Sequence, residues 1–415
     1  MPGVFLLIRN GGFSIAINMK LTRTPGRPIA KEHRIPRDGW DRAPWNRWSF
    51  QHIREILPTT EVWRGNGPIW QFQENPTNLD PVTFTSHSGQ STTVIDWLLQ
   101  NYADGILVIH HGEIRYERYL NQMTERTLHL SQSMAKSVTS AVAGILVARG
   151  LLDPEEHIGT YLPELKETGW KDAKLRHALD MTSGVRYVED YEALDSDIAA
   201  TDVASGWRPA QPDVPYFQCM WDQILSLKDT VREHGALFEY RSIETDVLAH
   251  CMERVTQTRL AELISRELWQ PLGVQESACF TVDAAGYPLA DGGFNATLRD
   301  YARFGQMLCS GGVGNGRQIV PREWLLDTFD TNPSLFSDDN NMDLDNGAYR
   351  NQFWIRDIER RILMARGVFG QIVYADMDNS LTIARLASWP EFVSSERKTD
   401  DLRAFDAITH FLTNQ

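Results

Sequence analysis

Short apolar segments near both ends of the chain have the length and composition of β-strands. Residues 106–109 and 114–119 flank a turn at 110–113, which predicts a β-hairpin. Further along the chain, four more strands are predicted, followed by a last helix at 401–412. The four segments are residues 352–355, 361–364, 372–374 and 381–384. Strands therefore come from two regions that are far apart in the sequence.

Between these strands, residues 131–345 alternate helical patterns with loops that contain Gly, Pro and Asp. Strands at both ends with helices between them predict an α+β fold, in which one antiparallel sheet is flanked by helices and carries an inserted helical region. We expect a single domain at 45–415, with a sheet lobe at 45–130 and 346–415 and a helical region at 131–345. Residues 1–44 are expected to form a poorly ordered N-terminal extension.

A long helical pattern begins at Ser133. Apolar residues follow at 134, 138, 141, 142, 145 and 146, and Gly150 marks the end. Because Ser133 and Lys136 are three residues apart, a helix places their side chains on one face. A lysine at the end of a buried helix is costly unless it has a role. The first turn of a helix also stabilises negative charge, which suits a serine nucleophile.

The Ser-x-x-Lys spacing has a purely structural alternative, a helix cap followed by a lysine whose ammonium reaches solvent. A second copy, at Ser395 and Lys398, lies among charged residues and opens no apolar helix, so we interpret it as exposed surface. A further element is the Tyr-x-Ser sequence at Tyr240, which precedes a helical segment at 247–255. Alone, Tyr240 would be interpreted as a core tyrosine.

These elements together resemble the serine β-lactamase-related hydrolases, in particular the 6-aminohexanoate-dimer hydrolases, which are amidases that degrade nylon oligomers. Serine β-lactamases and penicillin-binding proteins combine a Ser/Lys pair with a third element of this kind. The resemblance runs from about residue 45 to about residue 389 and implies a β-lactamase/DD-peptidase-like fold. The stretches that carry it are 45–50, 179–184, 189–191, 206–208, 292–297, 299–300, 303–305 and 367–371.

The resemblance implies a catalytic role for each matching position. Ser133 matches the acylated nucleophile, and Lys136 matches the lysine that takes the serine proton. Tyr240 matches the tyrosine that passes the proton to the leaving group and later activates water. The backbone N–H groups of Ser133 and Val368 match the oxyanion hole. A serine hydrolase with a Ser-Lys-Tyr catalytic centre is therefore expected.

Three further positions are expected to bind the substrate. Tyr191 matches a tyrosine on a loop over the site that holds the scissile amide. Asp202 lies eleven residues later, where the amidase branch has an aspartate that faces the ammonium end of the substrate. The branch usually has histidine at the position of Phe369, so we expect an apolar wall there. Ala365 stands where β-lactamases have the lysine of the K-T-G motif, which weakens the case for β-lactam turnover.

The expected mechanism makes opposite demands on two pKa values. Lys136 must be neutral to act as a base, so its pKa should be strongly lowered. Burial and the nearby helix N-terminus are both expected to lower it. Tyr240 is a poor base at neutral pH if its pKa is unperturbed, and the two groups are expected to share protons.

Composition limits the classes of partner. The formal net charge of −14 gives no electrostatic support for binding to nucleic acid or to an anionic membrane, so the expected partner is a small-molecule amide or ester substrate. The four cysteines are widely spaced, and His110 and His111 have no third ligand nearby, so we predict no metal or other cofactor.

The apolar residues 4–8 are too few for a secretory core, which favours a cytoplasmic location. A homodimer is implied by the resemblance only.

Three alternatives to a linear-amide hydrolase remain open. A carboxylesterase would use Ser133, Lys136 and Tyr240 in the same way and differ only in the lining of its pocket. A penicillin-binding or D-amino-acid peptidase is disfavoured by the missing K-T-G motif. A non-catalytic binding module is disfavoured because it has no physical need for a buried lysine beside a serine.

Overall fold

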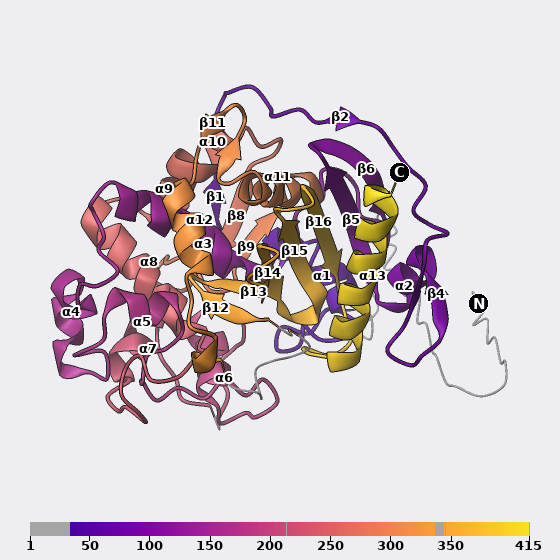
Figure 1. Ribbon diagram of the computed structural model, residues 1–415. Coiled ribbons are helices and arrows are strands. Elements are labelled where there is room, and N and C mark those ends of the chain that lie inside the picture. The colour runs from indigo at the N-terminus through magenta and orange to yellow at the C-terminus, as the bar shows by residue number, and fades with distance from the viewer. Residues whose placement is uncertain (1–33, 213, 337–343, 345, 415) are drawn as a thin grey trace.

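The computed structural model describes residues 34–212, 214–336, 344 and 346–414. Within them, the largest sheet has eight strands and joins both ends of the chain (Figure 1). Neighbouring strands are antiparallel except β2, which runs parallel to β6. The strand order is β12 (Ala348–Arg350), β13 (Phe353–Asp357), β14 (Ile362–Gly367), β15 (Gln371–Asp376), β16 (Leu381–Ala387), β5 (Ala103–His110), β6 (Glu113–Tyr119) and β2 (Gln73–Glu74). This confirms the predicted α+β fold, with a sheet built from distant segments.

The predicted hairpin is formed by β5 and β6, which pair antiparallel around a two-residue turn. The turn residues His111 and Gly112 both have positive φ angles, 54° and 80°, as a tight hairpin turn requires. Every residue of β5 is buried. A strand in this position is buried on both sides because helices cover both faces of the sheet (Figure 1).

Different helices cover the two faces of the sheet. On one face, α11 (Leu298–Cys309) packs so closely that a Cβ added at Gly305 would lie 2.6 Å from the side chain of Val373. On the other face, α13 (Ser395–Thr413) packs against the ring of Tyr374. Val373 and Tyr374 are consecutive residues of β15, and consecutive side chains of a strand point to opposite faces.

The helix predicted from Ser133 is α3 (Met134–Ala148), which lies between the sheet and the helical region (Figure 1). Its residues from the first turn to position 146 are all buried. A Cβ added at Gly144 would lie 2.4 Å from the indole of Trp324, so this glycine allows close packing against α12 (Arg322–Phe329). Gly150, with a φ of 69°, follows the end of the helix as predicted.

The region predicted to be helical also contains strands. β8 (Ala278–Thr281) and β9 (Phe294–Ala296) form a second sheet with β1 (Thr59–Val62) and β7 (His129–Leu130). Both strands are short and wholly buried, so they lack the alternation that identifies a strand in sequence. The other helices are α1 (Asn46–Ser49), α2 (Val94–Gln100), α4 (Ile158–Tyr161), α5 (Leu175–Leu179), α6 (Asp197–Ala204), α7 (Met220–Ser226), α8 (Ile243–Thr256), α9 (Leu260–Ile264), α10 (Gln270–Leu272) and α12 (Arg322–Phe329). Two further strand pairs are β3 (Thr83–Thr85) with β4 (Ser91–Thr93), and β10 (Val313–Gly314) with β11 (Arg317–Gln318).

The segment before residue 45 packs against the helical region. Trp40 is fully buried, and its indole N–H donates a hydrogen bond to the backbone carbonyl of Trp207 at 2.8 Å. Arg37 binds the same carbonyl at 2.7 Å. The predicted boundary at residue 44 is therefore wrong for residues 34–44, and the remainder of the predicted extension, 1–33, lies outside the described residues.

The second Ser-x-x-Lys copy forms the first turn of α13, an amphipathic helix that begins earlier than the predicted helix at 401–412. Leu402, Phe405 and Ile408 of this helix are buried, whereas Ser395 itself is exposed, as expected for a surface position. Among the helices of the described residues, none combines the length and the apolar character that crossing a membrane requires.

Candidate active site

Ser133 lies at the N-terminal end of α3, and Lys136 lies one turn further along the helix. Ser133 is half-buried, whereas only 1% of Lys136 is exposed. The Lys136 Nζ atom donates hydrogen bonds to Ser133 Oγ at 3.0 Å and to the backbone carbonyl of Asp291 at 2.8 Å. The amine is therefore held inside the protein beside the hydroxyl, and the alternative of a lysine that reaches solvent is excluded.

Tyr240 reaches the same amine from the segment before α8. The Lys136 Nζ atom is 5.2 Å from the centre of the Tyr240 ring. The ring stacks on Trp354 of β13, with 5.6 Å between ring centroids and 20° between planes. Burial raises the pKa of Tyr240, and the charge of Lys136 and hydrogen bonds with Ser133 and Lys136 oppose that rise. The structure thus brings together the three side chains that the sequence singles out.

The pKa of Lys136 lies above the ordinary value of a lysine, so the predicted lowering is wrong. Burial alone would lower this pKa, but the surrounding acidic groups outweigh it. These groups are, in decreasing order of effect, Tyr240, Asp291, Glu189 and Asp246. They come from separate segments, so sequence reasoning could not place them beside the amine. A proton must leave the Lys136–Tyr240 pair before the serine can be deprotonated.

The end of β14 passes close to the start of α3. A Cβ added at Gly367 would lie 2.5 Å from the carbonyl oxygen of Ser131 and 3.1 Å from the backbone nitrogen of Ser133, so only glycine fits. Val368 follows directly and begins a short 3₁₀ turn. Among the described residues, neither the Ser133 nor the Val368 N–H donates a backbone hydrogen bond outside its own element. The backbone N–H groups of the first residues of a helical turn also have no acceptor within that turn.

Phe369 is a core residue, so the prediction that its side chain forms a wall against the substrate is wrong. Only 1% of it is exposed. Its ring packs against Phe50 and Phe392, with centroid distances of 5.3 Å and 4.6 Å. Its φ of 60° is unusual for a bulky residue. Phe369 therefore anchors the turn that carries Val368.

Glu189 is a site residue that the sequence reasoning missed. Its carboxylate accepts hydrogen bonds from the Tyr191 hydroxyl and from both the backbone N–H and the hydroxyl of Ser242. Burial raises the pKa of Glu189, and the charge of Lys136 opposes that rise. The only signal in the sequence was its place in the stretch 189–191, which carried the family resemblance but assigned no role to the glutamate.

Tyr191 lies near the site, but its hydroxyl is engaged by Glu189. Its ring stacks on Phe392, with a centroid distance of 5.1 Å and an interplanar angle of 26°. Burial raises the pKa of Tyr191, and Glu189 and Tyr240 raise it further. A contact between Tyr191 and a substrate amide stays a prediction.

Asp202 lies on α6 and forms an ion pair with Arg208, whose Nε atom is 2.7 Å from the carboxylate. Arg208 also binds both carboxylate oxygens of Asp41, at 2.8 Å and 3.0 Å. Burial raises the pKa of Asp202 to about 6, although Arg208 lowers it. Its charge is thus already balanced within the protein, and its predicted contact with a substrate ammonium stays a prediction.

Ala365, the residue at the usual K-T-G lysine position, is buried within the core beside α3. Arg366 takes the opposite side of the strand, and its guanidinium carbon lies 5.9 Å from the centre of the Trp354 ring. Because adjacent residues of a strand point to opposite faces, Arg366 does not take the place of the missing lysine.

Comparisons with known proteins agree with the fold. The family model described as Beta-lactamase matches residues 98–407. The 6-aminohexanoate-dimer hydrolase of Paenarthrobacter ureafaciens is 30% identical over 359 residues, which cover 85% of this chain and 88% of that protein.

Solved structures give the same result. A candidate 6-aminohexanoate-dimer hydrolase from Bacillus anthracis superposes with a TM-score of 0.85 at 28% identity, over 94% of this chain and 99% of that chain. A family VIII carboxylesterase superposes with a TM-score of 0.55 at 15% identity, over 76% of this chain and 95% of that chain. The second likeness concerns the fold alone.

Proposed function

Since the chain belongs to the β-lactamase family, we propose that it is a serine hydrolase that cleaves linear amides through an acyl-enzyme on Ser133. The observation that carries this proposal is the 3.0 Å contact between Lys136 Nζ and Ser133 Oγ at the start of a buried helix. Tyr240 lies against the same amine. A hydroxyl, an amine and a phenol in this arrangement can move a proton from nucleophile to leaving group.

In the proposed reaction, Ser133 Oγ attacks the carbonyl carbon and its proton passes to the Lys136–Tyr240 pair. The backbone N–H groups of Ser133 and Val368 donate to the oxyanion, and each such donor is typically worth about 3–4 kcal/mol. As the C–N bond breaks, Tyr240 gives a proton to the leaving amine. A water molecule then loses a proton to Tyr240, attacks the acyl-enzyme, releases the acid and restores the serine hydroxyl.

The proposed substrate class is a linear amide with a free ammonium end, of the kind named for the Paenarthrobacter ureafaciens relative. Tyr191, held over the site by Glu189, is proposed to contact the scissile amide. Asp202 is proposed to attract the ammonium end. For that role, the Asp202 carboxylate must bind the ammonium end of the substrate while it also pairs with Arg208.

A carboxylesterase is the second candidate function, and a specific observation favours it. The charge of Asp202 is already balanced by Arg208, so a neutral substrate needs no rearrangement of this ion pair. The ester alternative uses the same three catalytic side chains. A penicillin-binding or peptidase function is less supported because Ala365 supplies no cation.

The test is a hydrolysis screen over linear amides with a free amine, short-chain esters and β-lactams. Each substrate is run with the wild type and with Ser133→Ala. The expected result is turnover of amides or esters that Ser133→Ala abolishes, together with loss of covalent labelling by a fluorophosphonate probe. Labelling that survives in Ser133→Ala would move the nucleophile elsewhere. A folded wild type that is neither labelled nor active would favour a non-catalytic binding module.

A further inference from the structure

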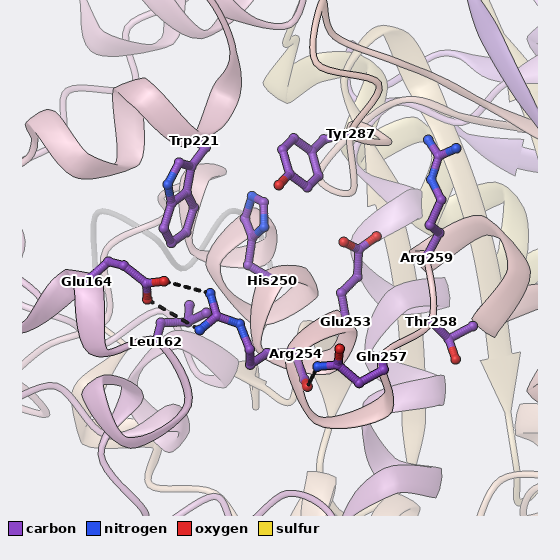
Figure 2. A pocket seen from close by; sticks show the side chains of 10 residues that line it. All are labelled: Leu162, Glu164, Trp221, His250, Glu253, Arg254, Gln257, Thr258, Arg259 and Tyr287. Atoms are coloured by element: carbon purple, nitrogen blue, oxygen red, sulfur yellow. Dashed lines mark hydrogen bonds and ion pairs between the residues drawn. The ribbon is translucent and has the colours of Figure 1, made fainter.

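A surface pocket of about 440 Å³ lies on the helical region, beside the later turns of α8 (Figure 2). The ring of His250 lies between Trp221 and Tyr287, with centroid distances of 4.7 Å and 4.6 Å. Burial lowers the pKa of His250 to about 4, so its ring is neutral at neutral pH. Glu253 also lines this pocket, and burial raises its pKa. The catalytic side chains do not line the pocket.

A smaller cavity of about 10 Å³ adjoins this pocket. His250, Glu253 and Tyr287 line both spaces, and Asp246 lines the smaller one only. A volume near 10 Å³ is about the least that holds one water molecule. The smaller cavity therefore places Asp246 beside a space that can hold one water molecule, next to the surface pocket.

Asp246 connects this cavity with the catalytic lysine. Only 3% of Asp246 is exposed, and its Oδ1 atom accepts a hydrogen bond from the Ala290 N–H at 2.9 Å. Its Oδ2 atom has no hydrogen-bond partner within the described part of the chain. The residue after Ala290 is Asp291, whose carbonyl binds Lys136 Nζ at 2.8 Å. A buried carboxylate oxygen without a partner is costly, so a water molecule in the cavity would stabilise it.

The charged groups that face Asp246 allow it to gain and lose a proton. Burial raises the pKa of Asp246 well above its ordinary value, Asp291 and Asp283 raise it further, and Lys136 lowers it. On the cavity side, the titratable groups are His250, Glu253 and Tyr287. Two buried carboxyl groups beside one ammonium cannot both be charged without cost, so a proton is readily shared among them.

We propose that Asp246 and the adjoining cavity form a proton-exchange route between solvent and the Lys136–Tyr240 pair, separate from the path of the substrate. In activation, an N–H bond of Lys136 breaks as an O–H bond forms on the Asp246 carboxylate, and that proton then passes to water in the cavity and on to solvent. No group is oxidised or reduced. The return of a proton follows the same atoms in reverse. This inference rests on the proposed acyl-enzyme function.

An ester substrate is the sharpest probe, because ester hydrolysis at neutral pH releases one proton per turnover, whereas hydrolysis of an amide to a carboxylate and an ammonium releases none. Asp246→Asn keeps an acceptor for the Ala290 N–H but cannot carry the proton. Ala249→Leu fills the small cavity, which Ala249 lines. Glu262→Gln, at an exposed position of α9, is the matched control for an acid-to-amide change.

The expected result for Asp246→Asn and Ala249→Leu is a fall in kcat of about tenfold or more in dilute buffer, with unchanged KM, since loss of a proton-transfer group typically costs 10²–10⁴-fold at most. Added imidazole, a small proton carrier, should restore kcat in Asp246→Asn, and Glu262→Gln should match the wild type. An unchanged kcat, or a loss that imidazole does not restore, would overturn the route. If Ala249→Leu does not fold, Asp246→Asn decides alone.

Labelling of Ser133 by a fluorophosphonate probe separates this inference from the proposed function. The route alone would be overturned if labelling and activity depend on Ser133 while Asp246→Asn behaves like the wild type. Activity that persists in Ser133→Ala would overturn the acyl-enzyme proposal, and the route with it.

Discussion

Glu189 binds Ser242 through both of its carboxylate oxygens. The Ser242 N–H donates to Oε2 at 2.5 Å, and the Ser242 hydroxyl donates to Oε1 at 2.6 Å. Ser242 directly precedes α8 and lies two residues after Tyr240, so this contact fixes the segment that carries the phenol. The Tyr191 hydroxyl binds the same carboxylate. One acidic side chain therefore joins the loop of Tyr191 to the segment that carries Tyr240.

Replacement of this acid should impair catalysis more than folding. Glu189→Gln keeps an acceptor oxygen but loses the charge, and a hydrogen bond to a charged group is worth about 1.5–3 kcal/mol. We expect kcat/KM to fall about tenfold or more. Because the Glu189 charge raises the pKa of Lys136, the acid limb of the pH–rate profile should also move to lower pH.

The matched control for this change is Glu192→Gln, an exposed acid of the same loop. It should leave both kcat/KM and the acid limb unchanged. A Glu189→Gln variant with wild-type kcat/KM and an unmoved profile would remove Glu189 from the site.

The charge state of Lys136 predicts an alkaline activity profile. The pKa of Lys136 is raised by the acidic groups around it, and only the neutral amine can accept the Ser133 proton. Activity should therefore rise as pH increases from neutral towards alkaline values. The measurement is kcat/KM against pH for a neutral ester, whose own charge does not change. A profile that is flat from pH 5 to 9, or highest in acid, would contradict this assignment.

The close approach at Gly367 predicts a selective loss of oxyanion stabilisation. Gly367→Ala adds a methyl group 3.1 Å from the Ser133 nitrogen and 2.5 Å from the Ser131 carbonyl oxygen, so the strand must move away from α3. The Val368 N–H moves with it, and loss of one oxyanion donor typically lowers kcat by about 10²–10³-fold.

Gly67→Ala is the control, because nothing lies within 4 Å of a Cβ added there. It should keep full activity and the same melting temperature. If Gly367→Ala folds and retains wild-type kcat, the oxyanion hole does not include Val368.

The sequence could predict the elements whose signals are local. Six of the eight strands of the central sheet, all except β2 and β12, and α3 have clear patterns. The spacing of Ser133 and Lys136 on one helical face is set by helix geometry alone. The short strands β8 and β9 have no such signal, because each is wholly buried. Their pairing depends on segments far away in the chain.

The predictions that failed depend on what surrounds a side chain in three dimensions. The pKa of Lys136 is decided by acids from distant segments, which no spacing rule brings together. Phe369 is buried because Phe50 and Phe392 cover it, although it directly follows Val368. Position next to a site residue in sequence does not determine whether a side chain faces the site.

A partly buried histidine, His177, predicts loss of stability in acid. Burial, with the nearby His234 and Lys174, lowers the pKa of His177 from 6.5 to about 4, so the folded protein holds it neutral while the unfolded chain protonates it below about 6.5. The unfolded state then binds more protons, and stability falls as pH drops from 6.5 to 4. The measurement is the melting temperature against pH.

His177→Asn removes this titration while keeping an acceptor for the Lys174 N–H, which His177 Nδ1 binds at 3.1 Å. Its melting temperature should fall less between pH 6.5 and 4 than that of the wild type. His410→Asn, at an exposed position of α13, should follow the wild-type curve. Equal curves for all three proteins would show that His177 does not contribute to acid sensitivity.

The ion pair of Asp202 offers a direct choice between the two candidate functions. Asp202 and Asp41 both bind Arg208, at 2.7 Å and 2.8 Å, so removal of either carboxylate disturbs the same guanidinium. If Asp202 also attracts an ammonium end, Asp202→Asn should raise KM several-fold for amides with a free amine and leave KM for neutral esters unchanged. Asp41→Asn is the matched control, since it should weaken the ion pair without this substrate dependence. Equal changes in KM for both substrate classes, or the same pattern in both variants, would limit Asp202 to its ion pair with Arg208 and leave the esterase as the better assignment.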